Sequence, residues 1–487
     1  MFYLTIRQNG GERAVAFEGT PLLDELLAAE GLSLPHPCGG GGRCGKCAVA
    51  VEGVLSPPTE EEVRRGCRLS CRTRLLGNAV VTLPDTAAAM QVETETAPLT
   101  WTGKGVTAGY AAAVDLGTTT VAVKVYAPDG TCCGTASAQN PQTVIAADVM
   151  GRIETALRGE GERLRTMILG TVRELIASAC PDGVEPIGIT VTGNTTMLYL
   201  LCGHDPSALS RAPFAADRLF DVTCTLPGLS APVYLPPCMN AFVGADITCA
   251  VLAAGMCEQT QTALLCDIGT NGELALWKGG TLYVTSTAAG PAFEGAGITC
   301  GCGSIEGAVD RVWTENGGLC VHTIGEVPAV GICGSGVIDA VAAGLALGEI
   351  DESGAMEEPM VLSGAVSLHP CDVRAVQLAK AAIAAGIETL MESAGATAEE
   401  IGTLYIAGGF GSHLNVQSAA RIGLIPAELA GKVKVLGNAA LSGASMLLLD
   451  RDKLEEIRRI RAASRHVNLG GNPVFNEHYM DQMFFPE

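Results

Sequence analysis

Short runs of alternating hydrophobic and polar residues open the chain and predict β-strands. Residues 2–7 and 13–17 alternate with a period of two on either side of Asn9-Gly10-Gly11, which is typical of a hairpin. The same reasoning, applied further along, predicts a helix at 21–30, a strand at 48–51, a short helix at 59–65 and a strand at 79–83.

Helical periodicity marks three longer or clearly bounded segments. The helix at 21–30 is expected to begin with Thr20 as its N-cap and Pro21 at its first position. Residues 373–393 carry an apolar stripe at helical spacing, so they predict an amphipathic helix. Residues 452–463 are rich in charges of both signs and predict a helix on the surface.

A longer pattern of buried strand, polar turn and second strand occurs twice. It spans residues 111–123 and recurs 152 positions later at residues 264–276, so that Asp267 repeats Asp115. A repeat at this separation predicts two structurally similar domains. We expect a middle domain at 109–206 and a C-terminal domain at 207–487.

Each copy predicts a hairpin whose tip can bind phosphate. Glycine lets backbone N–H groups approach phosphate oxygens, hydroxyl and amide side chains add donors, and the aspartate can order Mg²⁺ through water. A single copy could equally be an ordinary hairpin whose aspartate caps the turn, but two copies favour a clamp around a polyphosphate. The two predicted phosphate loops consist of Asp115, Gly117, Thr118, Thr119 and Thr120, and of Asp267, Gly269, Thr270, Asn271 and Gly272.

Two further features accompany the repeated hairpins. A buried strand runs into a glycine turn at 404–412, where Gly408, Gly409 and Gly411 could lie against an adenosine ring. Asp246 follows another polar turn and is a candidate for a carboxylate that orients water or is linked to Mg²⁺. A purely structural capping role for Asp246 stays open.

Composition limits the class of protein. A chain of 487 residues with 48% hydrophobic residues predicts two to four folded domains. The net charge of −21 argues against nucleic acid or an anionic membrane surface as a partner. The 19 cysteines, an odd number in a long chain that opens like a strand and not like a secretory leader, favour a reducing cytoplasm and an anaerobic host.

Four of these cysteines have the spacing of iron–sulfur ligands. Cys38, Cys44 and Cys47 lie in a glycine-rich loop with the spacing C-x5-C-x2-C, and Cys71 follows. This arrangement is one residue longer than the C-x4-C-x2-C…C layout of plant-type 2Fe-2S proteins. A zinc site would normally show two CxxC pairs, and a phosphate-binding P-loop would end in Ser or Thr. Cys67 remains an alternative to Cys71 as the fourth ligand.

With these ligands in a loop, the first part of the chain has the order of elements of a β-grasp ferredoxin. Hairpin, helix, ligand loop and closing strands cover residues 1–85. Residues 86–108 have no strong periodicity and are expected to form a linker. The expected fold is therefore multidomain, α+β and α/β, with a 2Fe-2S ferredoxin domain before two domains of the repeated type.

The two phosphate hairpins and the later glycine turn resemble the acetate and sugar kinase/heat-shock chaperone/actin superfamily. The resemblance covers residues 110–450 and rests on the order of the three motifs. It implies two ribonuclease-H-like domains that bind ATP between them.

Nearly the whole chain resembles the reductive activators of corrinoid proteins. The resemblance includes the turn at 194–197, the loop at 289–295 and the terminal segment at 472–486. It implies that ATP drives transfer of one electron from the 2Fe-2S cluster to cob(II)alamin of a methyltransferase partner, which regenerates cob(I)alamin. It also implies an external low-potential electron donor, and a homodimer is one expected assembly. Ser286, in a small-residue loop, is a candidate to approach the corrinoid.

Two rival functions stay open at this point. One is an ATP-dependent activator similar to those of 2-hydroxyacyl-CoA dehydratases, which share the ATPase core but lack a ferredoxin domain. The other is a ferredoxin module on a nucleotide-binding scaffold that senses redox state without catalysis. The loop from Cys38 to Cys47 argues against the first, and corrinoid-dependent ATP turnover would exclude the second.

Overall fold

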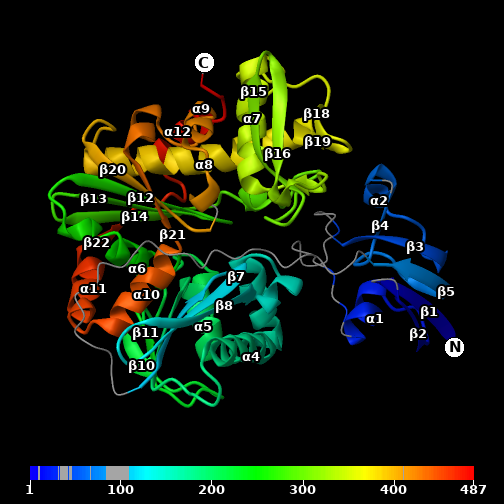
Figure 1. The fold of residues 1–487 in the computed structure, drawn as a ribbon, viewed down its shortest axis with the longest axis horizontal. Helices are drawn as coiled ribbons and strands as arrows, with labels where there is room; N and C mark the ends of the chain where they lie inside the picture. The colour runs from blue at the N-terminus through cyan, green and yellow to red at the C-terminus, as the bar shows by residue number, and fades with distance from the viewer. Residues whose placement is uncertain are drawn as a thin grey trace.

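The protein consists of three successive parts, which Figure 1 shows in blue, in cyan to green, and in green to red. The computed structural model describes residues 1–8, 11–30, 32, 34, 42, 47–65, 67–83, 109–409 and 411–486. Cys38, Cys44 and the whole of the expected linker, 86–108, lie outside the described residues. Among those residues, no helix is both long enough and apolar enough to cross a bilayer.

The N-terminal part is a five-stranded mixed sheet with the order β2-β1-β5-β3-β4. The expected hairpin is confirmed: β1 pairs with β2 in antiparallel register, and β5 pairs with β1 in parallel. Leu4, Ile6 and Val81 point into a core that α1 covers. The elements are β1 (Phe2–Gln8), β2 (Gly11–Phe17), α1 (Leu23–Ala29), β3 (Ala48–Leu55), α2 (Glu60–Arg65), β4 (Arg68–Leu69) and β5 (Leu75–Thr82).

The predicted start of the first helix is wrong by two residues. The helix begins at Leu23 after Leu22, so Thr20 is not its N-cap. Strand-like pairing keeps the preceding residues extended. The Leu75 N–H donates a hydrogen bond to the Pro21 carbonyl, and Leu22 forms an antiparallel β-bridge with Arg74. The edge of the sheet therefore decides where the helix begins, and the sequence pattern around Pro21 does not reveal this contact.

The middle part is built on a six-stranded sheet with the order β10-β11-β9-β6-β7-β8. β6 and β7 form the first predicted hairpin, β8 continues it antiparallel, and β9 and β11 run parallel to β6. The elements are β6 (Ala111–Leu116), β7 (Thr120–Tyr126), β8 (Cys132–Gln139), α3 (Val149–Thr155), α4 (Gly161–Ala179), β9 (Gly188–Gly193), α5 (Thr195–Cys202), β10 (Val222–Cys224) and β11 (Val233–Leu235).

The C-terminal part repeats this topology in the sheet β21-β20-β12-β13-β14-β22. The antiparallel run β12-β13-β14 corresponds to β6-β7-β8, and the parallel strands β20 and β21 correspond to β9 and β11. Both sheets thus have the ribonuclease-H-like order that the superfamily resemblance implies, and their similarity agrees with the sequence repeat. The strands are β12 (Thr262–Ile268), β13 (Gly272–Lys278), β14 (Thr281–Thr287), β20 (Ile401–Ala407), β21 (Val433–Gly437) and β22 (Ser464–His466).

The expected division between these two domains after residue 206 stays a prediction. The sheet of the middle part, however, includes β10 and β11, which both follow that residue. A division at 206 would separate these two strands from their sheet.

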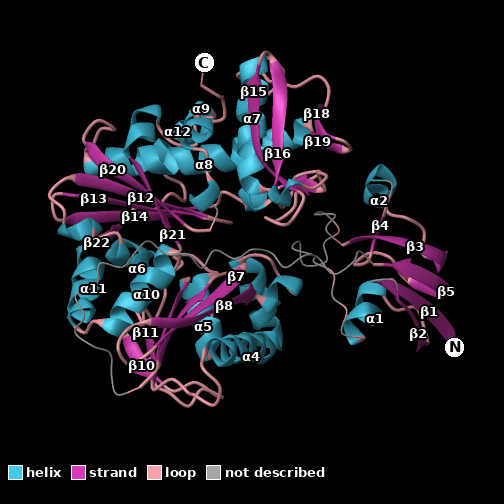
Figure 2. Cartoon of the chain, viewed as in Figure 1, coloured by secondary structure: helices cyan, strands magenta, loops and turns pink. Residues whose placement is uncertain are grey.

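Helices connect and cover the two six-stranded sheets (Figure 2). α6 (Ala245–Ala253) packs against α10 (Ala439–Leu449), and α10 also contacts β6 and β9 of the middle sheet. α7 (Gly334–Leu347) packs on a small sheet, β16-β15-β17. The remaining elements are β15 (Ala308–Glu315), β16 (Gly318–Thr323), β17 (Gly331–Ile332), β18 (Met360–Ser363), β19 (Val366–Leu368), α8 (Pro370–Ala394), α9 (Val416–Arg421), α11 (Asp452–Ala463) and α12 (Pro473–Asp481).

Candidate functional site

The tips of the two repeated hairpins lie next to each other, and one glutamate connects them. Thr119 of the first tip donates a hydrogen bond to Oε2 of Glu294 at 3.3 Å, and Thr270 of the second donates to Oε1 at 2.8 Å. Glu294 ends the short helix η5 (Pro291–Glu294), which contacts α7 and α8. The two predicted phosphate loops are therefore brought together by a shared partner. This partner, Glu294, lies 175 positions after Thr119 in the chain.

Asp115 and Asp267 occupy equivalent positions at the ends of β6 and β12, where each pairs with the facing strand of its hairpin. Asp115 accepts a hydrogen bond at 2.9 Å from Asn438, the N-cap of α10. Burial raises the pKa of Asp115 to about 6, which Asn438 partly offsets. Burial and the neighbouring Asp115 raise the pKa of Asp267 to about 7.

Two further acids join this pair. Asp246 lies in the first turn of α6, and burial raises its pKa to about 7, with added effects from Asp267 and Asp115. Burial likewise holds the pKa of Glu273 well above its ordinary value, and Asp246 and Asp267 raise it further. Carboxylates that repel one another in this way provide the oxygen ligands that Mg²⁺ prefers.

The surroundings of Asp246 are compatible with both of its candidate roles, whereas those of Ser286 differ from the expected loop. Asp246 Oδ1 accepts the Ile247 N–H at 2.8 Å, so it stabilises the start of α6 and lies among the acids at the same time. Ser286 is not in a loop, because β14 continues to Thr287. It pairs across the sheet with Glu273 and donates a hydrogen bond to that carboxylate at 3.2 Å.

The three glycines predicted to lie near adenosine follow β20. Gly408 has a φ of +87°, and a Cβ at this position would lie 2.5 Å from Asp267 Oδ1. Gly411 has little room as well, since a Cβ there would lie 2.6 Å from the side chain of Ile406. Gly409 is exposed on the same turn. Gly408 thus contacts the second phosphate loop directly, and the role of this turn at adenosine stays a prediction.

Sequence reasoning did not identify Glu294 or Asn438 as site residues. Glu294 lies in the loop at 289–295, whose sequence indicates only a family resemblance, and Asn438 precedes a helix with no distinctive motif. Asn438 reaches Asp115 across 323 positions of the chain. Only the three-dimensional fold could have revealed either contact.

The N-terminal domain brings two of the four predicted cluster ligands together. The sulfur atoms of Cys47 and Cys71 lie 3.3 Å apart, both residues are buried, and no disulfide joins them. This separation fits two thiolates that converge on one iron–sulfur cluster. It supports the choice of Cys71 over Cys67 as fourth ligand, while Cys38 and Cys44 lie outside the described residues.

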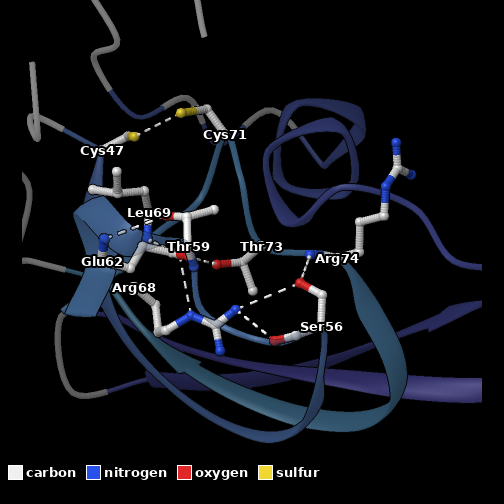
Figure 3. A network of polar contacts seen from close by, with 9 residues as sticks. All are labelled: Cys47, Ser56, Thr59, Glu62, Arg68, Leu69, Cys71, Thr73 and Arg74. Carbon is white, nitrogen blue, oxygen red and sulfur yellow. Dashed lines mark hydrogen bonds and ion pairs between the residues drawn. The ribbon is translucent and has the colours of Figure 1, made fainter. Parts of the chain in front are cut away.

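A buried glutamate organises the segment that carries Cys71 (Figure 3). Glu62 Oε1 accepts hydrogen bonds from Arg68 Nε at 3.1 Å, from the Leu69 N–H at 2.8 Å and from the Thr73 hydroxyl at 3.0 Å. Its Oε2 accepts the Thr59 N–H at 2.7 Å. Burial alone would raise the pKa of Glu62, but these donors outweigh it and lower the pKa to about 2.

Comparison with known families agrees with this architecture. The 2Fe-2S iron–sulfur cluster binding domain matches residues 6–76, the middle region of RACo matches residues 110–259, and the C-terminal ASKHA domain of RACo matches residues 261–487. The fold and the site therefore define a class of protein, in which a 2Fe-2S ferredoxin domain is joined to an actin- and sugar-kinase-like nucleotide-binding core.

Individual relatives narrow the class further. The chain is 32% identical to the corrinoid activation enzyme RamQ of Eubacterium limosum, over 77% of this chain and 70% of that protein. It is 28% identical to the [Co(II) methylated amine-specific corrinoid protein] reductase of Methanosarcina barkeri, over 52% of this chain and 51% of that one. The solved structure of a reductive activator for corrinoid, iron–sulfur protein covers 99% of this chain and 98% of its own, with 27% identity and a TM-score of 0.71. The chain belongs to the family of corrinoid activation enzymes.

Proposed function

We propose that this protein is an ATP-dependent activator that passes one electron to the cob(II)alamin of a corrinoid protein and so regenerates cob(I)alamin in a methyltransferase system. The observation that carries the proposal is the combination of two sites in one chain. The buried thiols of Cys47 and Cys71 lie 3.3 Å apart in a ferredoxin-type domain. In the core, Glu294 connects the tips of the two repeated hairpins.

The redox chemistry explains why ATP is needed. When bound, a plant-type cluster supplies one electron at roughly −400 mV. If the cobalt couple lies roughly 100 mV lower, the transfer is uphill by about 2 kcal/mol, because 59 mV corresponds to a tenfold change for one electron. ATP binding or hydrolysis can offset this by stabilising the complex in which the cobalt is ready for reduction.

Different residues are assigned to phosphate binding, to Mg²⁺ binding and to the cluster. We assign phosphate binding to the backbone and hydroxyls of the two hairpin tips, 117–120 and 269–272. We assign Mg²⁺, bound directly or through water, to Asp115, Asp246 and Asp267, because burial already raises the pKa of each carboxyl and a cation would stabilise the charged forms. We assign the cluster to Cys38, Cys44, Cys47 and Cys71.

The partners follow from the same chemistry. The corrinoid protein holds the cobalamin, and the activator takes electrons from an external low-potential donor. We also propose a homodimer as the assembly in solution, which sedimentation of the purified protein would test.

ATP turnover in the presence of the partner tests the proposal against a redox sensor. The reduced protein is mixed with ATP and Mg²⁺, with and without an oxidised candidate corrinoid protein, and phosphate release is measured. The proposal predicts turnover that increases when the corrinoid protein is added. Turnover that no corrinoid protein changes, in a protein that carries its cluster, would contradict it.

A further inference from the structure

Two buried side chains, those of Asn140 and Arg152, donate hydrogen bonds to the backbone of the first predicted phosphate loop. Neither residue is part of the site described above. The side-chain amide of Asn140 donates to the Gly117 carbonyl at 2.8 Å, and its backbone N–H donates to the Thr119 carbonyl at 2.8 Å. Arg152 Nη2 donates to the Thr118 carbonyl at 2.5 Å. Three successive carbonyls of the loop therefore point toward the protein interior.

The geometry of the trans peptide decides where the amides point. In a planar trans peptide, the N–H points opposite to the C=O of the same unit. The N–H groups of Thr118 and Thr119 consequently point away from Asn140 and Arg152. Successive amides turned in one direction form an anion-binding arrangement.

Arg152 is unusual because it is a fully buried cation with neutral partners. Its side chain is 0% exposed, and besides Thr118 it donates to the Ala146 carbonyl at 3.1 Å and approaches the Met197 sulfur at 3.0 Å. Among the described residues, no carboxylate accepts a hydrogen bond from Arg152, and the nearest charge effect comes from the exposed Asp148. Burial lowers its pKa to about 10, so the guanidinium stays charged at neutral pH.

Burying a charge is costly when no carboxylate pairs with it directly, and Arg152 has only the exposed Asp148 as an opposite charge nearby. The phosphates of a nucleotide are the opposite charges that the proposed function would bring to this loop. We infer that Arg152, together with Asn140, is a positioning residue for ATP: it orients the Thr118–Thr119 peptide and supplies the positive charge that the bound triphosphate balances. This inference rests on the proposed ATP site.

The test compares a charged and an uncharged ligand on the full-length protein. Dissociation constants for ATP, with Mg²⁺, and for adenosine are measured by calorimetry under anaerobic conditions. Arg152→Met removes the charge but keeps a similar length, so ATP binding should weaken by about tenfold while adenosine binding changes by less than about twofold. A merely structural role would weaken both ligands equally, and that result, or unchanged ATP binding, would overturn the inference.

Two more variants keep the test decisive. Arg152→Lys retains the charge and is used if the methionine variant does not fold. A lysine has a single nitrogen, so it does not reproduce the two separate hydrogen bonds of the guanidinium to the Ala146 and Thr118 carbonyls. ATP binding should therefore weaken by about threefold, while adenosine binding stays unchanged. Unchanged ATP binding in this variant would overturn the inference. Lys380→Met is the matched control, because Lys380 is also fully buried and donates to a carbonyl, that of Phe484. It should leave both constants unchanged. A native protein that fails to bind ATP would contradict the proposed function itself.

Discussion

At the scale of single residues, three acids near the two hairpin tips lower the stability of the fold. Asp115, Asp246 and Asp267 are half-buried close to one another, and each has a raised pKa. A fold selected only for stability would not place three acids together. This arrangement makes sense if the acids serve a cation and a polyphosphate, and it predicts that removing one charge stabilises the protein.

Asp246→Asn should raise the thermal stability of the nucleotide-free protein while lowering ATP turnover. The folded pKa of about 7 exceeds the ordinary value of 3.8, so the native carboxyl destabilises the fold as the pH rises through this range. The increase in the free energy of unfolding of the variant should be near zero at pH 4 and should reach about 1–2 kcal/mol at pH 8. This value is reduced because the Asp246 side chain is partly exposed. Thermal unfolding at both pH values measures it. A gain that does not grow with pH would contradict the raised pKa.

Glu62 illustrates the opposite case, a carboxylate that stabilises. Its pKa of about 2 lies below the ordinary value of 4.5, so its contribution is complete above pH 4.5 and is lost as the pH falls toward 2. Glu62→Gln should cost about 2 kcal/mol at pH 7, because one amide end would face N–H donors. Chemical unfolding followed by the visible absorbance of the cluster measures this cost.

Glu60→Gln is the control for this variant, since Glu60 is exposed on the same helix. It should unfold like the native protein. An equal loss of stability in the two variants would show that the hydrogen-bond network around Glu62 does not hold the Cys71 segment.

At the scale of elements, hydrophobic periodicity predicted which helices and strands exist better than it predicted where they begin and end. The helix at 452–463 and both repeated hairpins are confirmed, and the helix expected at 373–393 is α8, Pro370–Ala394. These elements have strong local patterns. The first helix begins two residues late because Pro21 and Leu22 pair with a distant strand.

The same reasoning explains which site residues could be predicted. The two repeated hairpins, which stay predicted phosphate loops, could be found from the sequence, because the glycine, threonine and aspartate of a phosphate-binding turn occur close together in the chain. Glu294, Asn140 and Arg152 act through contacts with loops elsewhere in the chain, and no local pattern marks a residue that acts in this way.

The turn after β20 gives a prediction at this scale. Gly408→Ala would place a Cβ 2.5 Å from Asp267 Oδ1 at a φ of +87°. The strain should cost about 1–2 kcal/mol and displace the second phosphate loop, so ATP turnover should fall. Gly431→Ala is the control, because nothing lies within 4 Å of its Cβ position and its φ is not positive. Equal turnover in the two variants would contradict the contact.

At the scale of the whole molecule, two similar sheets are joined by the packing of α6 against α10. Gly443 of α10 allows this, because a Cβ there would lie 2.1 Å from the Cys249 carbonyl of α6. The N-cap of α10 is Asn438, which holds Asp115 of the other sheet. The helix pair therefore connects the two halves of the proposed nucleotide site.

Gly443→Ala should push α6 and α10 apart and so disturb both stability and catalysis. We expect a loss of about 1–3 kcal/mol in unfolding free energy, together with reduced ATP turnover. Gly170→Ala on α4 is the matched control, since it is also a helical glycine but has nothing within 4 Å. It should stabilise the protein by about 0.5–1 kcal/mol. If both variants behaved alike, the close helix contact would not limit the fold.

In the proposed function, one molecule couples ATP to the reduction of a partner's cobalt. The most direct measurement is the absorbance of cob(I)alamin after the reduced protein is mixed with an oxidised corrinoid protein, with and without ATP. Cob(I)alamin should form only when ATP is present, and none should form with Asp267→Ala. Equal cob(I)alamin formation without ATP, or in the Asp267 variant, would contradict the coupling.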